Sequence, residues 1–376
     1  MVLRKLLKDE HGKTRKLWEE VFTEDTPEFL DYYYSVKTEE NEIYVIEEDG
    51  EIRSMLHLNP YIMQIGDATY PSHYIVAVAT EEAYRKRGYM AKLLGQAVKD
   101  MRENGEPFTF LMPAAEAIYY PHGFRFIYQQ KQKKITGKYE KDFSCEVSLA
   151  EKKDCSELAD FADGLLRQTY EVYAKRDQYY YERLLQEVQS EEGGILLVKK
   201  EGKLVGFFSY GKGEQYEVVE PLFMEPHQDR LFPAIWELTK DEAVPVHVGG
   251  ISQEGSQKPL IMAKILHIPN MLSVLETKEE IELVLQVFDE PTGNSLGTFS
   301  LVGKGKMKVV ELKDFGKEAR LQAAALREEP ERISIGDLTS ILFGYTCLEE
   351  MNVSQTIKRE LGKVKPLRNI FLNEIV

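Results

Sequence analysis

The sequence predicts a mixed α/β (α+β) fold, in which helices pack on central sheets of mixed strand direction. An apolar segment at 75–80 runs into a basic turn and then into a helical pattern at 89–101. Two strand hairpins occur at separate places in the chain, and an antiparallel meander followed by a helix marks its C-terminal part. We therefore expect two similar α/β units and a C-terminal sheet-and-helix unit.

The composition limits both the domain count and the class of partner. With 376 residues the chain exceeds an ordinary single domain, so two or three domains are expected. A formal net charge of -15 argues against nucleic acid and anionic membranes as partners and favours a cationic substrate. Three widely spaced cysteines, Cys145, Cys155 and Cys347, indicate neither a disulfide framework nor a metal site. Without a signal peptide or a membrane-length apolar run, we expect a soluble cytoplasmic protein.

Two short helices are expected near the start of the chain. Segment 13–22 has helical periodicity, and Thr26 is a good N-cap for a second helix through residue 34. Between these helices, Glu24 and Asp25 are candidates to contact a cationic substrate. Helix capping and solvation explain these two carboxylates equally well, so both interpretations stay open.

A hairpin follows, and its pattern recurs later in the chain. The first hairpin, 43–58, turns at Asp49-Gly50, which is a strong two-residue turn signal. A helix predicted at 158–173 precedes the second hairpin, 193–208, in which Gly202 takes the place of Gly50. The repeated order predicts a second copy of the same unit.

The second copy is expected to lack a phosphate site. A strand at 216–223 and a helix at 231–238 follow the second hairpin, in the order in which 75–80 and 89–101 follow the first. The segment between them, 226–230, has neither a glycine nor a basic triplet. One ligand site per chain is therefore expected.

The turn before the helix at residue 89 has the chemistry of an anion site. Gly88 allows the backbone to approach a ligand closely, and Arg85, Lys86 and Arg87 add positive charge. Free backbone N–H groups and the positive dipole end at the start of the helix would face a pyrophosphate. Plain solvated charges that precede a core helix would look the same, and this alternative stays open.

This turn resembles the arginine/glutamine-x-x-glycine-x-glycine/alanine loop of the GNAT acetyltransferases, although Met90 stands where that family has a small residue. A second strand, 108–112, leads to Pro113-Ala-Ala115 and then to Ile118-Tyr-Tyr-Pro-His-Gly-Phe124. In GNAT proteins the strand after the helix splays to admit the pantetheine arm of acetyl-CoA. The following aromatic segment carries the tyrosine that protonates the departing thiolate, and Tyr119 occupies that place.

The C-terminal part predicts a meander, a helix and a docked tail. Strands are expected at 282–288, 297–302 and 307–312, and Ser334 begins a capping motif for a helix that stops at Gly344. The chain ends on the apolar octet Asn369-Ile-Phe-Leu-Asn-Glu-Ile-Val376. Exposed ends are usually polar, so this tail is expected to be packed against protein.

Taken together, these features resemble the enhanced intracellular survival (Eis) family of N-acetyltransferases over nearly the whole chain. The supporting strings are Val78-Ala-Thr80, Ala114-Ala-Glu-Ala-Ile-Tyr119, Asp337-Leu and the apolar C-terminus. The resemblance implies a GNAT domain at 1–141, a degenerate GNAT domain at 142–270 and a sterol-carrier-protein-like domain at 271–376. It also implies acetyl-CoA as co-substrate, no metal, a hexamer, and an aminoglycoside-like, polyamine-like or lysine amine as acceptor.

The resemblance also implies a set of site residues. Tyr119 would be the general acid, and the free C-terminal carboxylate on Val376 would be the general base. The residues expected to contact acetyl-CoA are Val78, Ala79, Thr80, Arg85, Lys86, Arg87, Gly88, Tyr89, Met90, Ala91, Ala114 and Ala115. A terminal carboxylate has an ordinary pKa of about 3.5, so it needs desolvation or a water relay to act as a base.

Several alternatives remain open from the sequence. Plain core packing would also explain Tyr119, and its neighbour Tyr120 is the alternative candidate for the general acid. His122 is a second candidate for the base. Two other function classes are a CoA-binding sensor that has lost catalysis and a carrier of apolar ligands. The tyrosine and the apolar tail speak against the sensor, and core packing explains the apolar meander at 283–301 that motivates the carrier.

Overall fold

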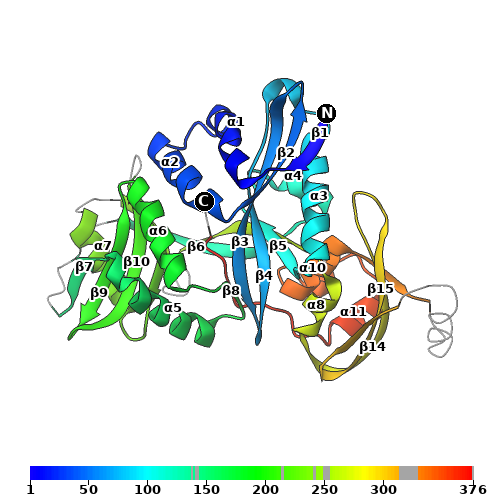
Figure 1. Cartoon of the computed structure of the whole chain (residues 1–376). Coiled ribbons are helices and arrows are strands. Elements are labelled where there is room, and N and C mark those ends of the chain that lie inside the picture. Colours follow the sequence, from blue (N-terminus) through cyan, green and yellow to red (C-terminus); the bar gives the residue numbers. More distant parts are fainter. Residues whose placement is uncertain are drawn as a thin grey trace.

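The computed structural model describes residues 1–136, 139, 144–212, 216–239, 243–248, 255–312 and 329–374. Within these residues the strands form a 14-stranded mixed sheet and a separate four-stranded sheet. Helices pack on both, which confirms the predicted mixed α/β fold class. Figure 1 shows the N-terminal part in the middle, the green second part on one side, and the yellow to red C-terminal part on the other.

The N-terminal part has helices on both faces of its sheet. Its strands are β1 (Val2–Lys5), β2 (Glu42–Glu48), β3 (Glu51–Ile65), β4 (Ala68–Thr80), β5 (Phe108–Leu111) and β6 (Arg125–Thr136), and its α-helices are α1 (Arg15–Val21), α2 (Pro27–Ser35), α3 (Tyr89–Glu103) and α4 (Glu116–Tyr119). Alternate side chains of β2 point to opposite faces. Ile43 and Val45 belong to the core under α1 and α2, whereas Tyr44 and Ile46 belong to the core under α3.

The helix cap and the hairpin turn predicted for this part are confirmed, and one predicted helix has different bounds. The Thr26 hydroxyl accepts a hydrogen bond of 3.1 Å from Phe29 N and begins α2. Asp49 and Gly50 have φ values of 57° and 80°, which a two-residue hairpin turn of the primed type requires. The expected helix at 13–22 is shorter, because residues 8–14 form a 3-10 helix before α1.

Strands β4 and β5 separate along their length. β4 pairs with β3 almost throughout, but it pairs with β5 only at Tyr74 and Phe110. A bulge in β4, where Ala77 has a φ of 49°, shifts the register opposite β3 and bends the strand. Beyond Tyr74 and Phe110 the two parallel strands therefore leave an opening in the sheet.

The second part repeats the hairpin and the strand–helix order. Its elements are β7 (Glu146–Leu149), α5 (Cys155–Thr169), β8 (Val172–Ala174), α6 (Gln178–Ser190), β9 (Gly194–Lys200), β10 (Lys203–Lys212), β11 (Tyr216–Phe223), α7 (Leu231–Thr239) and β12 (Ala243–His247). Glu201 and Gly202 have φ values of 52° and 74°, close to those of the first turn. The expected helix at 158–173 was too long, because it ends at Thr169 and residues 172–174 form β8 on the edge of β3.

The C-terminal part contains the predicted meander. Its elements, with the strand before it, are β13 (Ser256–Ile265), α8 (Ile268–Ser273), β14 (Glu276–Phe288), β15 (Ser295–Lys306), β16 (Lys308–Glu311), β17 (Glu331–Ser334), α10 (Ile335–Phe343), α11 (Gln355–Leu361) and β18 (Ile370–Phe371). β13 lies between β5 and β6, so a strand from far along the chain completes the N-terminal sheet. The Ser334 hydroxyl accepts from Asp337 N at 3.0 Å, and Gly344 ends α10 with a φ of 61°.

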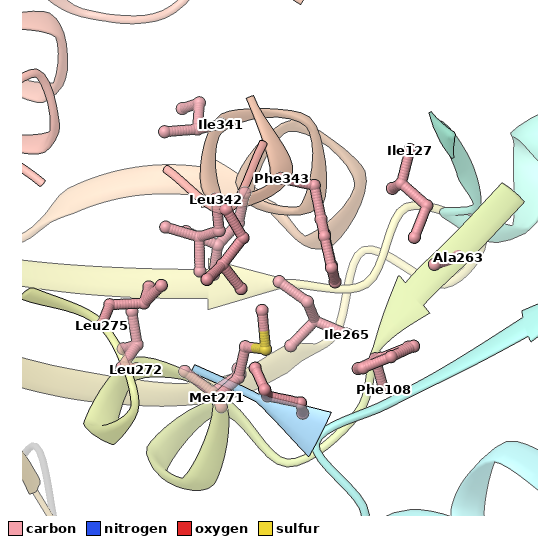
Figure 2. Close-up of a cluster of buried hydrophobic side chains, with 14 of the residues drawn as sticks. Phe108, Ile127, Ala263, Ile265, Met271, Leu272, Leu275, Ile341, Leu342 and Phe343 are labelled. Carbon is pink, nitrogen blue, oxygen red and sulfur yellow. The ribbon is translucent and has the colours of Figure 1, made fainter. Parts of the chain in front are cut away.

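A single apolar cluster joins the C-terminal part to the large sheet. Figure 2 shows side chains of α10 and α8 packed against β13 and β5. The rings of Phe343 and Phe108 meet edge to face with centroids 5.3 Å apart. Burying a large apolar side chain stabilises a fold by about 1.5–3 kcal/mol, so this shared core fixes the two parts relative to each other.

Candidate active site

The predicted basic turn forms a cradle at the start of α3. Gly88 is the N-cap with a φ of 76°, a conformation that favours glycine. The first intrahelical hydrogen bond runs from Lys92 N to Gly88 O at 3.2 Å, so the preceding amides of the helix point into the turn. A cavity of about 290 Å³ lies there and is lined by Thr80, Tyr84, Arg85, Lys86, Gly88, Tyr89, Met90 and Ala91.

The basic side chains brace the turn against the end of β4. Arg85 donates through Nε to Thr80 O at 3.1 Å, and Arg87 donates through Nη2 to Ala83 O at 3.1 Å. The Arg87 guanidinium also lies 4.5 Å from the centroid of the Tyr84 ring. Helix dipole, free amides and these charges together make the cradle suitable for a pyrophosphate.

The residues expected to meet the thioester lie along the opening between β4 and β5. Val78, Ala79 and Thr80 end β4, and the Ser54 hydroxyl, which donates to Ala79 O at 2.8 Å, holds this end against β3. Ala114 and Ala115 are exposed and follow the end of β5. Because β4 and β5 run parallel, both groups lie on the same side of the one backbone pairing between these strands, Tyr74 with Phe110.

Tyr119 is the buried tyrosine of the aromatic segment. It ends α4, is 7% exposed, and packs edge to face on Phe124 with ring centroids 5.8 Å apart. Burial raises the pKa of Tyr119 to about 12, so its hydroxyl stays protonated at neutral pH. Tyr120 differs, because its ring is 46% exposed and lies under the Arg125 guanidinium, 3.6 Å from the centroid.

His122 remains a second titratable group near this turn. Its side chain is half-buried, and desolvation lowers its pKa, with Lys264 acting in the same direction. A neutral imidazole at physiological pH has the chemistry of a base. Its backbone carbonyl accepts a hydrogen bond of 2.8 Å from Lys264 Nζ.

The C-terminal tail is packed into the protein up to its last described residue. β18 pairs in parallel with β8, and Ile370, Phe371 and Leu372 are buried, as the apolar octet predicts. The Asn373 side chain accepts hydrogen bonds from Tyr128 at 3.0 Å and from Gln130 at 3.2 Å. Val376 and Ile375 lie outside the described residues.

A buried arginine holds the end of this tail. Arg176 donates through Nη2 to Glu374 at 2.9 Å and through Nε to Glu220 at 2.6 Å, and all three side chains are nearly inaccessible to solvent. Its Nη1 donates to Ala174 O at 2.6 Å. Two carboxylates therefore share one guanidinium at this point.

The same carboxylates form one wall of a cavity between the N-terminal and second parts. The cavity has a volume of about 210 Å³. Its acidic lining residues are Asp25, Glu187, Glu191, Glu217, Glu220 and Glu374, and its other polar and aromatic lining includes Lys37, Tyr61, Tyr180, Arg183, His247 and Asn373. The Tyr61 ring lies 6.0 Å from that of Phe110, which places this cavity beside the strand that leads to Ala114.

Burial raises the pKa values of several carboxylates that line this cavity. Desolvation raises the pKa of Glu187, against the opposing effect of Lys37, and raises the pKa of Glu374 against Arg176. The pKa of Glu191 rises to about 7, chiefly by desolvation and then by the charge of Glu187. Desolvation also raises the pKa of Asp25, although the Trp18 indole donates to it at 2.6 Å. A bound cation would favour the ionised form of these carboxylates.

Comparisons with known proteins identify the N-terminal domain. Residues 2–127 match the model of the acetyltransferase (GNAT) domain. The chain is an acyltransferase with a GNAT domain at its N-terminus. The cradle at α3 and the opening between β4 and β5 both lie within the matched residues 2–127. A comparison with curated proteins found no match.

Solved structures share the fold over almost the whole chain. A conserved protein from Enterococcus faecalis V583, described as a probable N-acyltransferase, is 17% identical with a TM-score of 0.76 and covers 99% of each chain. A GCN5-related N-acetyltransferase from Anabaena variabilis is 15% identical with a TM-score of 0.72, over 97% of this chain and 94% of its own. Eis1 from Mycobacterium abscessus is 11% identical with a TM-score of 0.66, over 98% and 94%. At these identities the likeness is one of fold.

Among the described residues no group of three or more histidine, cysteine or acidic side chains is arranged to hold a metal ion. No helix in the described part is long and apolar enough to cross a membrane. The sequence analysis did not single out Glu187 or Arg176 as site residues. The only local signal for them is the tyrosine cluster Tyr179-Tyr-Tyr181 and the carboxylates that follow it.

We expect Gly88→Glu to abolish acetyl-CoA binding. The new side chain would place a carboxylate at the pyrophosphate cradle and would force a non-glycine residue into a positive φ. Calorimetry on the unaltered chain should give one site, because the second part lacks an equivalent turn.

Gly95→Glu is the matched control for this experiment. Gly95 lies on the exposed face of the same helix with open space around it, so the same side chain should leave binding unchanged. Two binding sites on the unaltered chain, or full binding by Gly88→Glu, would contradict the assignment of the cradle.

Proposed function

We propose that this chain is an acetyl-CoA-dependent N-acetyltransferase that acetylates an amine of a cationic small molecule, aminoglycoside-like or polyamine-like, or of a lysine side chain. The observation that carries the acceptor class is the cavity whose lining holds Glu187, Glu191 and four further carboxylates. Such a lining attracts ammonium groups and repels anions. The Eis-like sequence pattern supports the same class, and Eis1 of Mycobacterium abscessus shares the fold of this chain.

The proposed chemistry assigns a role to each group. The cradle residues 85–91 hold the pyrophosphate, and residues 78–80, 114 and 115 flank the pantetheine and thioester. Acetyl-CoA supplies the thioester, and the acceptor nitrogen attacks its carbonyl carbon after losing a proton. Tyr119, protonated because its pKa is about 12, donates its proton to the sulfur as the carbon–sulfur bond breaks.

The proposed base is the terminal carboxylate of Val376. Its support is the docked tail, because Arg176 fixes Glu374, two residues earlier, beside the acidic cavity. Negative charge around a carboxylate raises its pKa and improves it as a base. His122 is the alternative base, since its lowered pKa keeps it neutral.

We further propose the other features that the resemblance to the Eis family implies. These are an Eis-like assignment, a degenerate GNAT domain at 142–270, a sterol-carrier-protein-like domain at 271–376, a cytoplasmic location and a homo-hexamer. The carrier alternative is weaker than the enzyme, because Leu283, Leu285 and Leu301 are buried in the shared core and are not available to a ligand. The sensor alternative predicts acetyl-CoA binding without turnover.

We expect released thiol when acetyl-CoA is mixed with polyamines, aminoglycosides or lysine peptides. Glu187→Gln should raise the KM of the best acceptor by roughly 10- to 100-fold, the value of one charge-assisted hydrogen bond, with the KM of acetyl-CoA unchanged. Glu182→Gln is the control, because Glu182 lies on the same helix and pairs with Lys152 at 2.9 Å, away from the cavity.

The pH dependence offers a second measurement of the same site. Glu191 binds a cation only when ionised, so acceptor affinity should increase as the pH rises through about 7. Glu191→Gln should flatten this rise. Turnover of neutral or anionic acceptors in preference to amines would contradict the proposed acceptor class.

Tyr119→Phe should lower kcat by roughly 10²- to 10⁴-fold, the contribution expected of a general acid. The change keeps the ring that packs on Phe124 and removes only the hydroxyl, so melting temperature and acetyl-CoA affinity should be preserved. Tyr120→Phe is the matched control and should keep most of the activity. The reverse pair of results would assign the proton to Tyr120.

A peptide added after Val376 should abolish or severely reduce acetyl transfer. The extension replaces the terminal carboxylate by a neutral amide and leaves every original side chain in place. An N-terminal extension of the same length should keep activity, and both proteins should bind acetyl-CoA and melt alike. Full turnover by the C-terminally extended chain would remove Val376 from the mechanism in favour of His122 or a nearby carboxylate such as Glu116.

A further inference from the structure

The turn that follows Tyr119 is anchored by two buried cations through its backbone. Arg125 Nη1 donates to Tyr120 O at 3.0 Å and to Phe124 O at 2.9 Å. Lys264 Nζ donates to His122 O at 2.8 Å. Three carbonyl groups within the five residues after Tyr119 are therefore held by side chains of β6 and β13.

Each cation is in turn paired with a carboxylate of the C-terminal part. Lys264 lies 2.8 Å from Asp289 Oδ1, and Arg125 Nη2 donates to Glu290 Oε1. Asp289 and Glu290 are the first two residues after β14, in the turn between β14 and β15. Arg125 and Lys264 are 8% and 4% exposed, so both pairs are largely shielded from solvent.

The backbone of the turn also meets the C-terminal part directly. Gly123 has a φ of 82°, and a Cβ placed there would lie 2.8 Å from Glu290 Oε2 and 2.8 Å from Ile335 Cγ2. A Cβ on Gly336 would lie 2.5 Å from the Arg125 guanidinium carbon. Ser334, which caps α10, donates to Glu290 Oε1 at 3.1 Å. Two glycines thus permit a close approach that ordinary side chains would block.

We propose that Glu290 and Asp289 are positioning residues for catalysis, which hold the turn of Tyr119 through Arg125 and Lys264. The C-terminal part then serves the acetyl-transfer reaction as the rigid support of its general acid. This inference rests on the proposed role of Tyr119. Misplacement of a reacting group by about 1 Å can cost roughly 10²-fold in rate, so a loosened turn should reduce turnover strongly.

The pairs Arg125–Glu290 and Lys264–Asp289 contact the turn that follows Tyr119, whereas an ordinary surface ion pair contacts no part of the site. The acetyl-CoA cradle on α3 contacts neither Glu290 nor Arg125 among the contacts of the described residues. Loss of the pairs should therefore lower kcat and leave the KM of acetyl-CoA unchanged. A general loss of folding would instead affect both parameters and the fraction of active protein.

The test is a double-mutant cycle between Glu290→Gln and Tyr119→Phe. Glu290→Gln keeps the shape of the side chain and removes its charge, and alone it should lower kcat by roughly 10- to 10²-fold. In the Tyr119→Phe background the same change should alter kcat by no more than about twofold, because the group that it positions is already missing. Asp289→Asn gives the same cycle through Lys264 and His122 if Glu290→Gln does not fold.

Glu276→Gln is the matched control at the other end of β14. Glu276 pairs with Lys365 at 2.7 Å and is about half exposed, so kcat should stay within about twofold of the unaltered enzyme. The proposal is overturned if Glu290→Gln keeps full turnover, or if it lowers kcat by the same factor in both backgrounds. Failure of the proposed function is distinct, because Tyr119→Phe alone would then keep its activity.

Discussion

The separation of β4 and β5 is the constraint on which the rest of the site depends. Two parallel strands that pair only at Tyr74 and Phe110 leave backbone N–H and C=O groups beyond that point without the partners that a closed sheet would supply. The sheet tolerates the gap because β3 holds the other edge of β4 and β13 holds the other edge of β5. Two carbonyl groups at this end of β4 accept hydrogen bonds from side chains, Ala79 O from Ser54 Oγ and Thr80 O from Arg85 Nε.

Charge burial is the second organising feature. The net charge of the chain is strongly negative, yet its buried carboxylates are not spread evenly. Glu220 and Glu374 share Arg176, and their neighbours Glu187 and Glu191 face the cavity with raised pKa values. Keeping several carboxylates in one cavity costs stability unless cations or hydrogen bonds offset it, and Arg176 together with the hydroxyls of Tyr32 and Tyr181 supplies part of that offset.

Sequence patterns predicted the features that depend on neighbouring residues. The caps at Thr26 and Ser334 and the hairpin turns follow from local backbone chemistry. Residues 172 and 173 fall within the helix predicted from the sequence, but they form a strand because their pairing with β3 and β18 is set by distant segments. Tertiary contacts of this kind override local propensity.

The remaining site features join parts of the chain that no local pattern links. The acidic cavity takes its lining from the N-terminal part as well as from α6, β11 and the tail. The pairs of Arg125 with Glu290 and of Arg176 with Glu374 each span well over a hundred residues. A charged residue in a sequence is far more often solvated than buried, so nothing in the sequence singles out these partners.

The architecture gives a physical reason for a chain three times the length of its GNAT domain match. The N-terminal domain supplies the cradle and Tyr119, but its β5 edge is completed by β13 and the turn after Tyr119 is held by Asp289 and Glu290. The second part supplies Arg176 and most of the carboxylates beside the tail. Removing either part would expose the shared core at Phe108 and Phe343 or leave buried charges unpaired, so the GNAT domain depends on the whole chain for its geometry.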